Sequence, residues 1–250
     1  MIVFSRKAGS DVKVMQQTIQ SEAPSFKFEG ILGAPVPNIN NLNHHAHAFL
    51  PYNPTIIEVG AYEGAGTVGL AETYRHARLF ACEPNPRAFA VLEQRVATCR
   101  HATAVNVAVG TSNGIAKLYV QSAHDEMSAS LLPPRKNPDD LLDHPTVSVS
   151  VVVLDDWCRR QGLARVEFLR LDAGGLELQI LQSSPQTLKT ALVVVTRTHF
   201  DRPSTSVISY GVLKFFMEMM GFELLSHWYR EGFQGEATFV RKPLYDSIFR

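Results

Sequence analysis

The sequence predicts an α/β fold in which a mostly parallel, doubly wound sheet ends in an antiparallel hairpin. From Thr55 onward, short apolar or β-branched runs alternate with stretches of helical periodicity. This alternation is typical of a parallel sheet with helices on both faces. Towards the C-terminus, a helical stretch over 212–220 precedes two strand-like runs, 222–229 and 236–242, separated by a short turn. These runs indicate a hairpin that closes one edge of the sheet.

The individual elements are short and follow one another closely. We expect parallel strands at 55–59, 78–82, 103–107, 167–171 and 191–195. The intervening helices are expected at 66–76, 86–100, 154–161 and 175–181. Residues 108–120 carry Ser-Asn-Gly at 112–114, which predicts a β-hairpin, and 147–153 predict one more strand.

The N-terminal part of the chain has a different composition. Gly30, Gly33, Pro35 and Pro37 lead into an Asn-rich run, which is typical of turns and loops. We therefore predict an N-terminal lead-in or cap over 1–54 and a main domain over 55–250. This division suits a chain of 250 residues, since single α/β domains of that size are common.

The overall composition is that of a soluble globular protein, with 45% hydrophobic and 19% charged residues. Lys and Arg number 24, and so do Asp and Glu. The balanced charge gives no reason to expect nucleic acid or a membrane as partner. Three scattered cysteines, with no signal peptide or membrane span, predict a cytoplasmic protein with free thiols. A homo-oligomer stays open as an alternative.

The segment TIIEVGAYEGAGTVGLA, 55–71, is the most informative part of the sequence. An apolar strand ends at Glu58, a turn with Gly60, Gly64 and Gly66 follows, and a helix begins at once. Such glycines let the backbone approach a ligand closely. Glu83 lies at the end of the second strand, where an acid can bind both hydroxyls of a ribose. The pattern predicts a nucleoside cofactor.

Electrostatics favours one nucleoside over the others. A pyrophosphate at the turn would be repelled by the carboxylate of Glu58. S-adenosylmethionine carries a sulfonium and an ammonium group and no phosphate. It is therefore favoured over NAD or FAD.

At this point the motifs resemble a known family, the FkbM-type S-adenosylmethionine-dependent methyltransferases. EVGAYEG is similar to the family's D-V-G-A-N-x-G motif, and ACEPNP to its F-E-P-N-P motif. NVAVGTSNGIAKLYV, LDDW, LRLDAGGLELQIL and GFELL resemble later segments in the same order. The resemblance covers about 55–242 and implies a Rossmann-like class I methyltransferase fold.

The resemblance also implies roles for particular residues. Around the methionine moiety and the start of the following helix it places Glu58, Gly60, Tyr62, Glu63, Gly64 and Thr67. Glu83 would hold the ribose, with Pro84, Asn85, Val107 and Ala108 around the adenine. Asp172, at the end of the fourth strand, would complete the cofactor site and take part in catalysis.

Two departures from the family pattern concern the acceptor side. Gly174 stands where the family has Glu, and Arg197 follows the fifth strand where an acid is usual. Hard cations prefer several oxygen ligands, so we expect no metal site. The histidines at 44, 45 and 47 lie in a polar loop without further ligands nearby. His199 joins Asp172 as a candidate general base.

The expected activity is O-methylation of a hydroxyl on a small molecule, such as a natural product or a sugar. Two alternatives remain. Tyr210 and Lys214 form the Y-x-x-x-K pattern of NAD(P)-dependent short-chain reductases. The missing carboxylates would also suit a non-catalytic protein that binds S-adenosylmethionine.

Overall fold

The computed structural model describes residues 46, 48–120, 129–133, 145–199, 209–230 and 234–249. Contacts divide the chain into units of residues 1–41 and 42–250, and every described residue belongs to the second unit. The expected boundary between 54 and 55 therefore stays a prediction. Within the described residues, no helix is both long and apolar enough to span a membrane.

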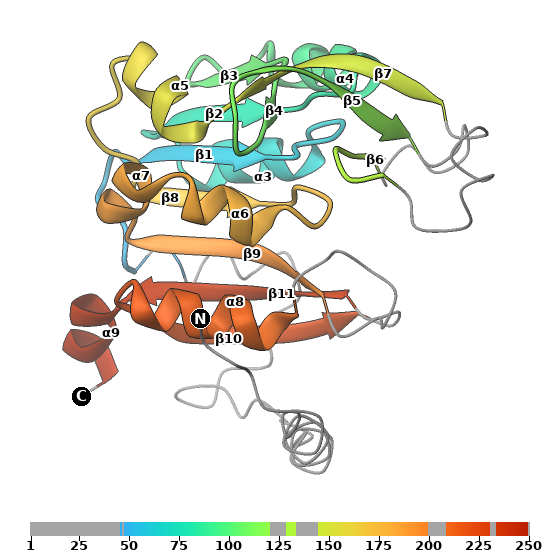
Figure 1. Ribbon diagram of the computed structural model, residues 1–250. Helices are drawn as coiled ribbons and strands as arrows, with labels where there is room; N and C mark the ends of the chain where they lie inside the picture. Colours follow the sequence, from blue (N-terminus) through green and yellow to red (C-terminus); the bar gives the residue numbers. More distant parts are fainter. Residues whose placement is uncertain are drawn as a thin grey trace, which may run out of the picture. The chain divides into compact units, whose positions relative to one another are not determined.

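The main sheet has seven strands in the order β10-β11-β9-β8-β1-β2-β3 (Figure 1). The strands are β1 (Thr55–Val59), β2 (Arg78–Cys82), β3 (Ala102–Val105), β8 (Phe168–Leu171), β9 (Val193–His199), β10 (Phe222–Arg230) and β11 (Gln234–Arg241). The five strands from β3 to β9 are parallel, and β11 lies antiparallel between β9 and β10. The mostly parallel sheet with a C-terminal hairpin at its edge is confirmed.

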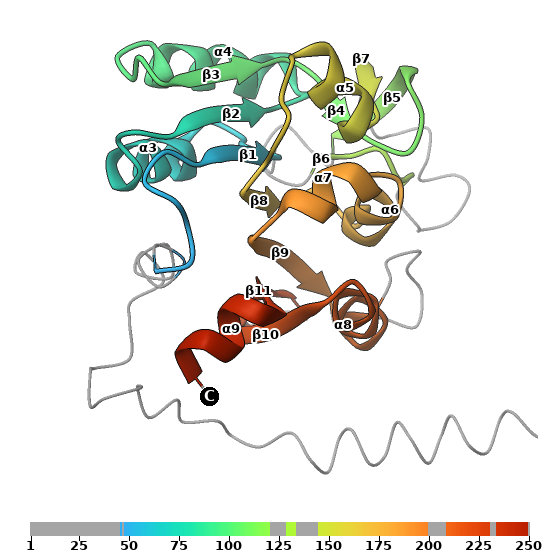
Figure 2. The same ribbon diagram turned by 90° about the vertical axis from the view of Figure 1, so that its left-hand side faces the viewer.

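Helices cover both faces of this sheet (Figure 2). One face carries α3 (Ala65–Thr73), α4 (Pro86–Val96) and α9 (Lys242–Phe249). The other carries α5 (Leu154–Arg160), α6 (Glu177–Gln182), α7 (Pro185–Thr190) and α8 (Tyr210–Met219). The start of α4 shows how the sequence fixes such a boundary: the Asn85 side chain accepts a hydrogen bond from the backbone N–H of Arg87, and Pro86 opens the helix.

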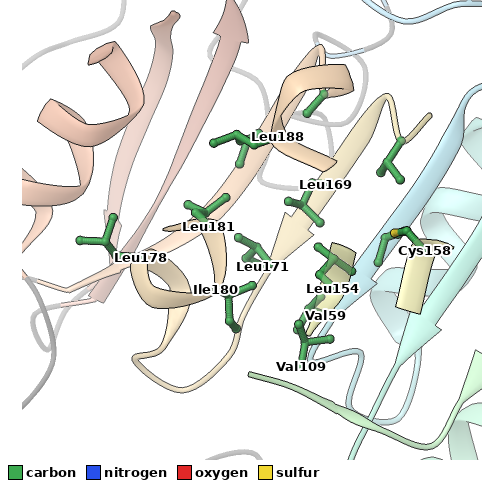
Figure 3. Packing of buried hydrophobic residues seen from close by; sticks show 14 of the residues in the cluster. Val59, Val109, Leu154, Cys158, Leu169, Leu171, Leu178, Ile180, Leu181 and Leu188 are labelled. Atoms are coloured by element: carbon green, nitrogen blue, oxygen red, sulfur yellow. The ribbon is translucent and has the colours of Figure 1, made fainter. Parts of the chain in front are cut away.

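Alternate residues of the central strands supply two cores. Ile56, Phe168 and Val193 are paired across β1, β8 and β9 and pack with the buried residues of α3. One position along, Ile57 and Leu169 belong to the core on the opposite face, which is shown in Figure 3 with residues of α5, α6 and α7. Burial on both faces explains why these strands are continuous apolar runs.

A second, four-stranded sheet has the order β4-β7-β5-β6. Its strands are β4 (Ala108–Val109), β5 (Gly114–Val120), β6 (Ala129–Ser130) and β7 (Thr146–Val152). The hairpin predicted over 108–120 is wrong, because β7 lies between β4 and β5 and pairs with both. Asn113 does not serve a tight hairpin turn; its amide donates to Asp156 at 2.6 Å and accepts from the N–H of Val153 at 3.0 Å.

Candidate active site

The glycine turn after β1 brings three strand ends together. The N–H groups of Gly60 and Ala61 both donate to the carbonyl of Cys82 at the end of β2, at 2.9 and 3.0 Å. Gly60 has φ +77°, and a Cβ on it would lie 1.9 Å from the carbonyl oxygen of Asp172 beyond β8. Tyr62 also has a positive φ of 51°. Only glycine fits at position 60, because the backbone of β8 passes so close.

Glu83 is held at the end of β2 by two backbone groups. One carboxylate oxygen accepts from the N–H of Tyr62 at 2.7 Å, and the other accepts from the N–H of Asn85 at 2.8 Å. Burial raises the pKa of this carboxyl, while the two N–H donors oppose the rise. Each oxygen can accept a further hydrogen bond. The arrangement is that of a fixed acceptor for two donors, such as the hydroxyls of a diol.

Asn106 joins this region and was not predicted from the sequence. Its side-chain amide donates to the backbone carbonyl of Glu83 at 2.8 Å, which ties the end of β3 to the end of β2. Val107 and Ala108 follow directly, and Ala108 is buried at the start of β4. A polar residue directly after a parallel strand is the signal that could have indicated Asn106.

Glu63 and Gly64 connect the turn to α4. The Glu63 carboxylate forms an ion pair with Arg95 at 3.0 Å. A Cβ on Gly64 would lie 2.6 Å from a methyl carbon of Leu92. The structure thus assigns both residues contacts that position the turn.

Glu58 lies at the centre of a buried charge network. Its carboxylate accepts from the Thr67 hydroxyl at 2.5 Å and from the Arg170 guanidinium at 2.6 Å. Arg170 also lies 3.7 Å from the Glu236 carboxylate on β11. Burial raises the pKa of Glu58, and Arg170 opposes that rise. A Cβ on Gly66 would lie 2.4 Å from the Arg170 guanidinium, so this glycine makes room for the ion pair.

Asp172 forms an ion pair with Arg197 at the end of β9. Both side chains are partly accessible, 40% for Asp172 and 34% for Arg197. Burial raises the pKa of Asp172 above its ordinary value, although the guanidinium of Arg197 opposes that rise. His199 ends β9 two residues later, and its side chain lies outside the described part. The structure therefore places Arg197 against Asp172.

The turn after β8 has no room for a side chain at position 174. Gly174 has φ +61°, and a Cβ on it would lie 2.8 Å from the carbonyl oxygen of Ala129 and 3.0 Å from Cβ of Ser130. The Ser130 hydroxyl donates to the Gly174 carbonyl at 2.8 Å. The departure at Gly174 therefore coincides with the packing of β6 against this turn.

Glu177 stabilises the same turn from the other side. Its carboxylate accepts from the N–H groups of Ala173 and Gly175 at 2.9 and 3.2 Å. Among the described residues, no group of three or more His, Cys, Asp and Glu side chains is placed to hold a metal ion. The histidines at 44, 45 and 47 lie outside these residues.

The Y-x-x-x-K pair lies on α8 and has structural contacts. Lys214 forms an ion pair with Glu218, and the Tyr210 ring stacks on His227 with 3.9 Å between centroids. The strand order also differs from the dinucleotide-binding order 3-2-1-4-5-6, because an antiparallel β11 follows β9. Both observations count against a reductase.

Comparison with known proteins identifies the family. A family model described as the methyltransferase FkbM domain matches residues 58–225, about two thirds of the chain. The chain belongs to the FkbM methyltransferase family. The resemblance found in the motifs is thereby confirmed, and with it S-adenosylmethionine as the methyl donor of the family.

Two relatives add detail. The 2-O-methyltransferase NoeI of Sinorhizobium fredii is 24% identical over 153 residues, which are 58% of this chain and 63% of that protein. The crystal structure of an FkbM methyltransferase from Methylobacillus flagellatus has a TM-score of 0.52 at 14% identity, over 82% of this chain and 48% of that one. The chain thus spans about half to two thirds of the length of these relatives, and the structural match confirms the Rossmann-like fold.

Proposed function

We propose that the protein transfers a methyl group from S-adenosylmethionine to a hydroxyl oxygen of a small molecule, such as a natural product or a sugar. Family membership supports methyl transfer. The name of the relative NoeI supports an oxygen acceptor. The observation that carries the proposal is Glu83, whose two carboxylate oxygens are oriented by Tyr62 and Asn85 at the end of β2.

In this proposal the residues around Glu83 bind the nucleoside. Glu83 accepts hydrogen bonds from the two ribose hydroxyls, and Val107 and Ala108 border the adenine together with Pro84 and Asn85. Gly60 lies close to the backbone that follows β8, which keeps the turn compact. The methionine moiety of S-adenosylmethionine can therefore lie against Gly60 and Tyr62. Glu63, Gly64 and Thr67 contribute by fixing the shape of the turn.

The charges near the turn support a donor without phosphate. Glu58, Glu83 and Asp172 lie close enough for Asp172 to raise the pKa of both glutamates. Arg170 compensates the charge of Glu58 and Arg197 that of Asp172, so the repulsion of a pyrophosphate comes mainly from Glu83. A cationic sulfonium or ammonium group is attracted by the same carboxylate.

Asp172 is the proposed base, and Arg197 positions it. When bound, the donor would supply an electrophilic methyl group for transfer from its sulfur to the acceptor oxygen, with S-adenosylhomocysteine as the second product. Asp172 receives the hydroxyl proton and releases it to solvent. Its ion pair with Arg197 favours the charged form and orients the carboxylate. Holding oxygen and methyl in line supplies most of the rate. His199 remains a second candidate base.

A non-catalytic protein that binds S-adenosylmethionine is the alternative. It is favoured by Gly174, which lacks the carboxylate of the family, and by the engagement of Asp172 with Arg197. Such a protein would bind the donor and its product but would transfer no methyl group to any acceptor.

Calorimetric titration tests the cofactor assignment. S-adenosylmethionine and S-adenosylhomocysteine should bind, and NADH and NADPH should not. Glu83→Gln should weaken both ligands by about tenfold or more, because hydrogen bonds to a charged group contribute about 1.5–3 kcal/mol each. Glu72→Gln is the matched control, since Glu72 is exposed near the end of α3. Binding of a nicotinamide cofactor alone would contradict the proposal.

A further inference from the structure

Helix α8 carries an apolar stripe on its outer side. Leu213 and Met217 are buried against the sheet, as expected of an amphipathic helix. On the opposite side, Val212, Phe215 and Met219 are 50%, 63% and 66% exposed. Their spacing of three and four residues places them on one face of the helix.

This stripe stands out in the described part of the protein. Six large hydrophobic residues are exposed there, and four belong to α8 and the residue after it, namely Val212, Phe215, Met219 and Met220. Single exposed apolar residues are ordinary, but a contiguous exposed group indicates an interaction site. In Figure 1 the helix lies in front of the β10–β11 hairpin, which forms one edge of the sheet.

We propose that this face binds α8 of a second copy of the chain and forms a two-fold symmetric dimer. Lys214 and Glu218 border the stripe as an exposed i, i+4 ion pair. In a two-fold contact the same surface patch takes part in both copies. If one residue contacts a second residue of the other copy, that second residue contacts the first in return. With the helices antiparallel, Lys214 faces Glu218 of the partner subunit, and Glu218 faces Lys214 of the partner subunit.

The charge pattern is the reason for choosing a second copy as the occupant. One cation and one anion lie on either side of the midpoint of the helix, so the face is complementary to itself. A surface that binds a strongly charged partner would instead carry charges of one sign, opposite to the partner's. The inference does not depend on the proposed function, because no residue of the face belongs to the candidate site.

The oligomeric state of the full chain tests the proposal. Sedimentation velocity and light scattering should detect a dimer that dissociates on dilution. Phe215→Glu should raise the dissociation constant at least about thirtyfold, since buried aromatic anchors dominate such contacts. Ile115→Glu is the matched control, because Ile115 is 81% exposed on β5 of the other sheet. Thermal unfolding of each variant verifies that it folds.

Charge reversal separates contacts between copies from contacts within the helix. Lys214→Glu alone and Glu218→Lys alone should each weaken the dimer about tenfold, because like charges then face each other twice. Mixing the two variants should restore association as a heterodimer, although the intrahelical pair stays broken in both chains. A wild-type chain that is monomeric at about 100 µM overturns the proposal. So does a dimer that is unaffected by Phe215→Glu, or a mixture that associates no better than either variant alone.

Discussion

Replacing Arg170 by Gln should destabilise the protein in a pH-dependent way. The Glu58 carboxylate is only 4% accessible, and Arg170 supplies its sole cationic partner among the described ion pairs. Removing one partner of a buried pair costs about 3–5 kcal/mol, because the remaining charge is left uncompensated. Since the Arg170 side chain is 30% accessible, we expect about 3 kcal/mol at pH 8. For a chain of this size that corresponds to about 6–12 °C in Tm.

The sign of the pH dependence follows from Glu58. Burial already raises its pKa in the folded protein, so stability falls as pH rises from 4.5 through the folded pKa. Without Arg170 that pKa rises further, because the guanidinium that opposes the effect of burial is gone. The variant therefore loses stability over a wider range of pH than the wild type. The difference between them should be small near pH 4.5 and reach its full value at alkaline pH.

Urea unfolding at several pH values measures this difference. The double variant Glu58→Gln/Arg170→Gln is the control, since it removes both charges and should recover most of the lost stability at pH 8. A loss that is equal at acidic and alkaline pH would attribute the effect to lost packing instead of charge. A double variant as unstable as Arg170→Gln would refute the reasoning in the same way.

Three further predictions concern the neighbouring elements. Gly174→Ala should lower the free energy of unfolding by about 1–2 kcal/mol, because φ is +61° and the new Cβ would lie 2.8 Å from the Ala129 carbonyl oxygen. The control is Gly69→Ala, which has open space around its Cβ and should be neutral or stabilising. Burial lowers the pKa of His227 from 6.5 to about 4. The unfolded state therefore binds the proton first, and stability falls as the pH drops through this range. In His227→Gln the midpoint of urea unfolding should decrease less over the same pH range. Arg197→Gln should raise the pKa of Asp172 and move the acidic limb of the methyl-transfer pH profile to higher pH, whereas Arg197→Lys should keep it near the wild-type position.

The strand–turn–helix around Gly60 could be predicted because its determinants are local. An apolar strand, a turn that needs positive φ and the following helix all lie within one continuous segment. Glu83 could be predicted for a similar reason, since a parallel sheet brings the carboxyl ends of β1 and β2 to the same edge.

The features that the sequence did not reveal depend on contacts between distant segments. The Glu58–Arg170 pair joins residues separated by 112 positions and exists because the register of β1 and β8 places them opposite each other. The hairpin prediction failed because β7 pairs with both β4 and β5. A local turn signal at Asn113 could not reveal a strand that arrives more than thirty residues later.

The two departures from the family pattern have a common consequence at the ends of β8 and β9. Gly174 admits Ser130 where a carboxylate would otherwise project, and Arg197 brings a cation to Asp172. Glu177 is engaged with the N–H groups of its own turn, so Asp172 is the carboxylate of this turn that remains partly accessible. An oxygen-rich cation site requires several such groups. The groups present here instead suit the proposed arrangement, in which Arg197 holds a single base, Asp172. The rate would then come mainly from positioning the reactants. Loss of methyl transfer in Asp172→Asn, measured at saturating concentrations of the donor, is the result this arrangement requires.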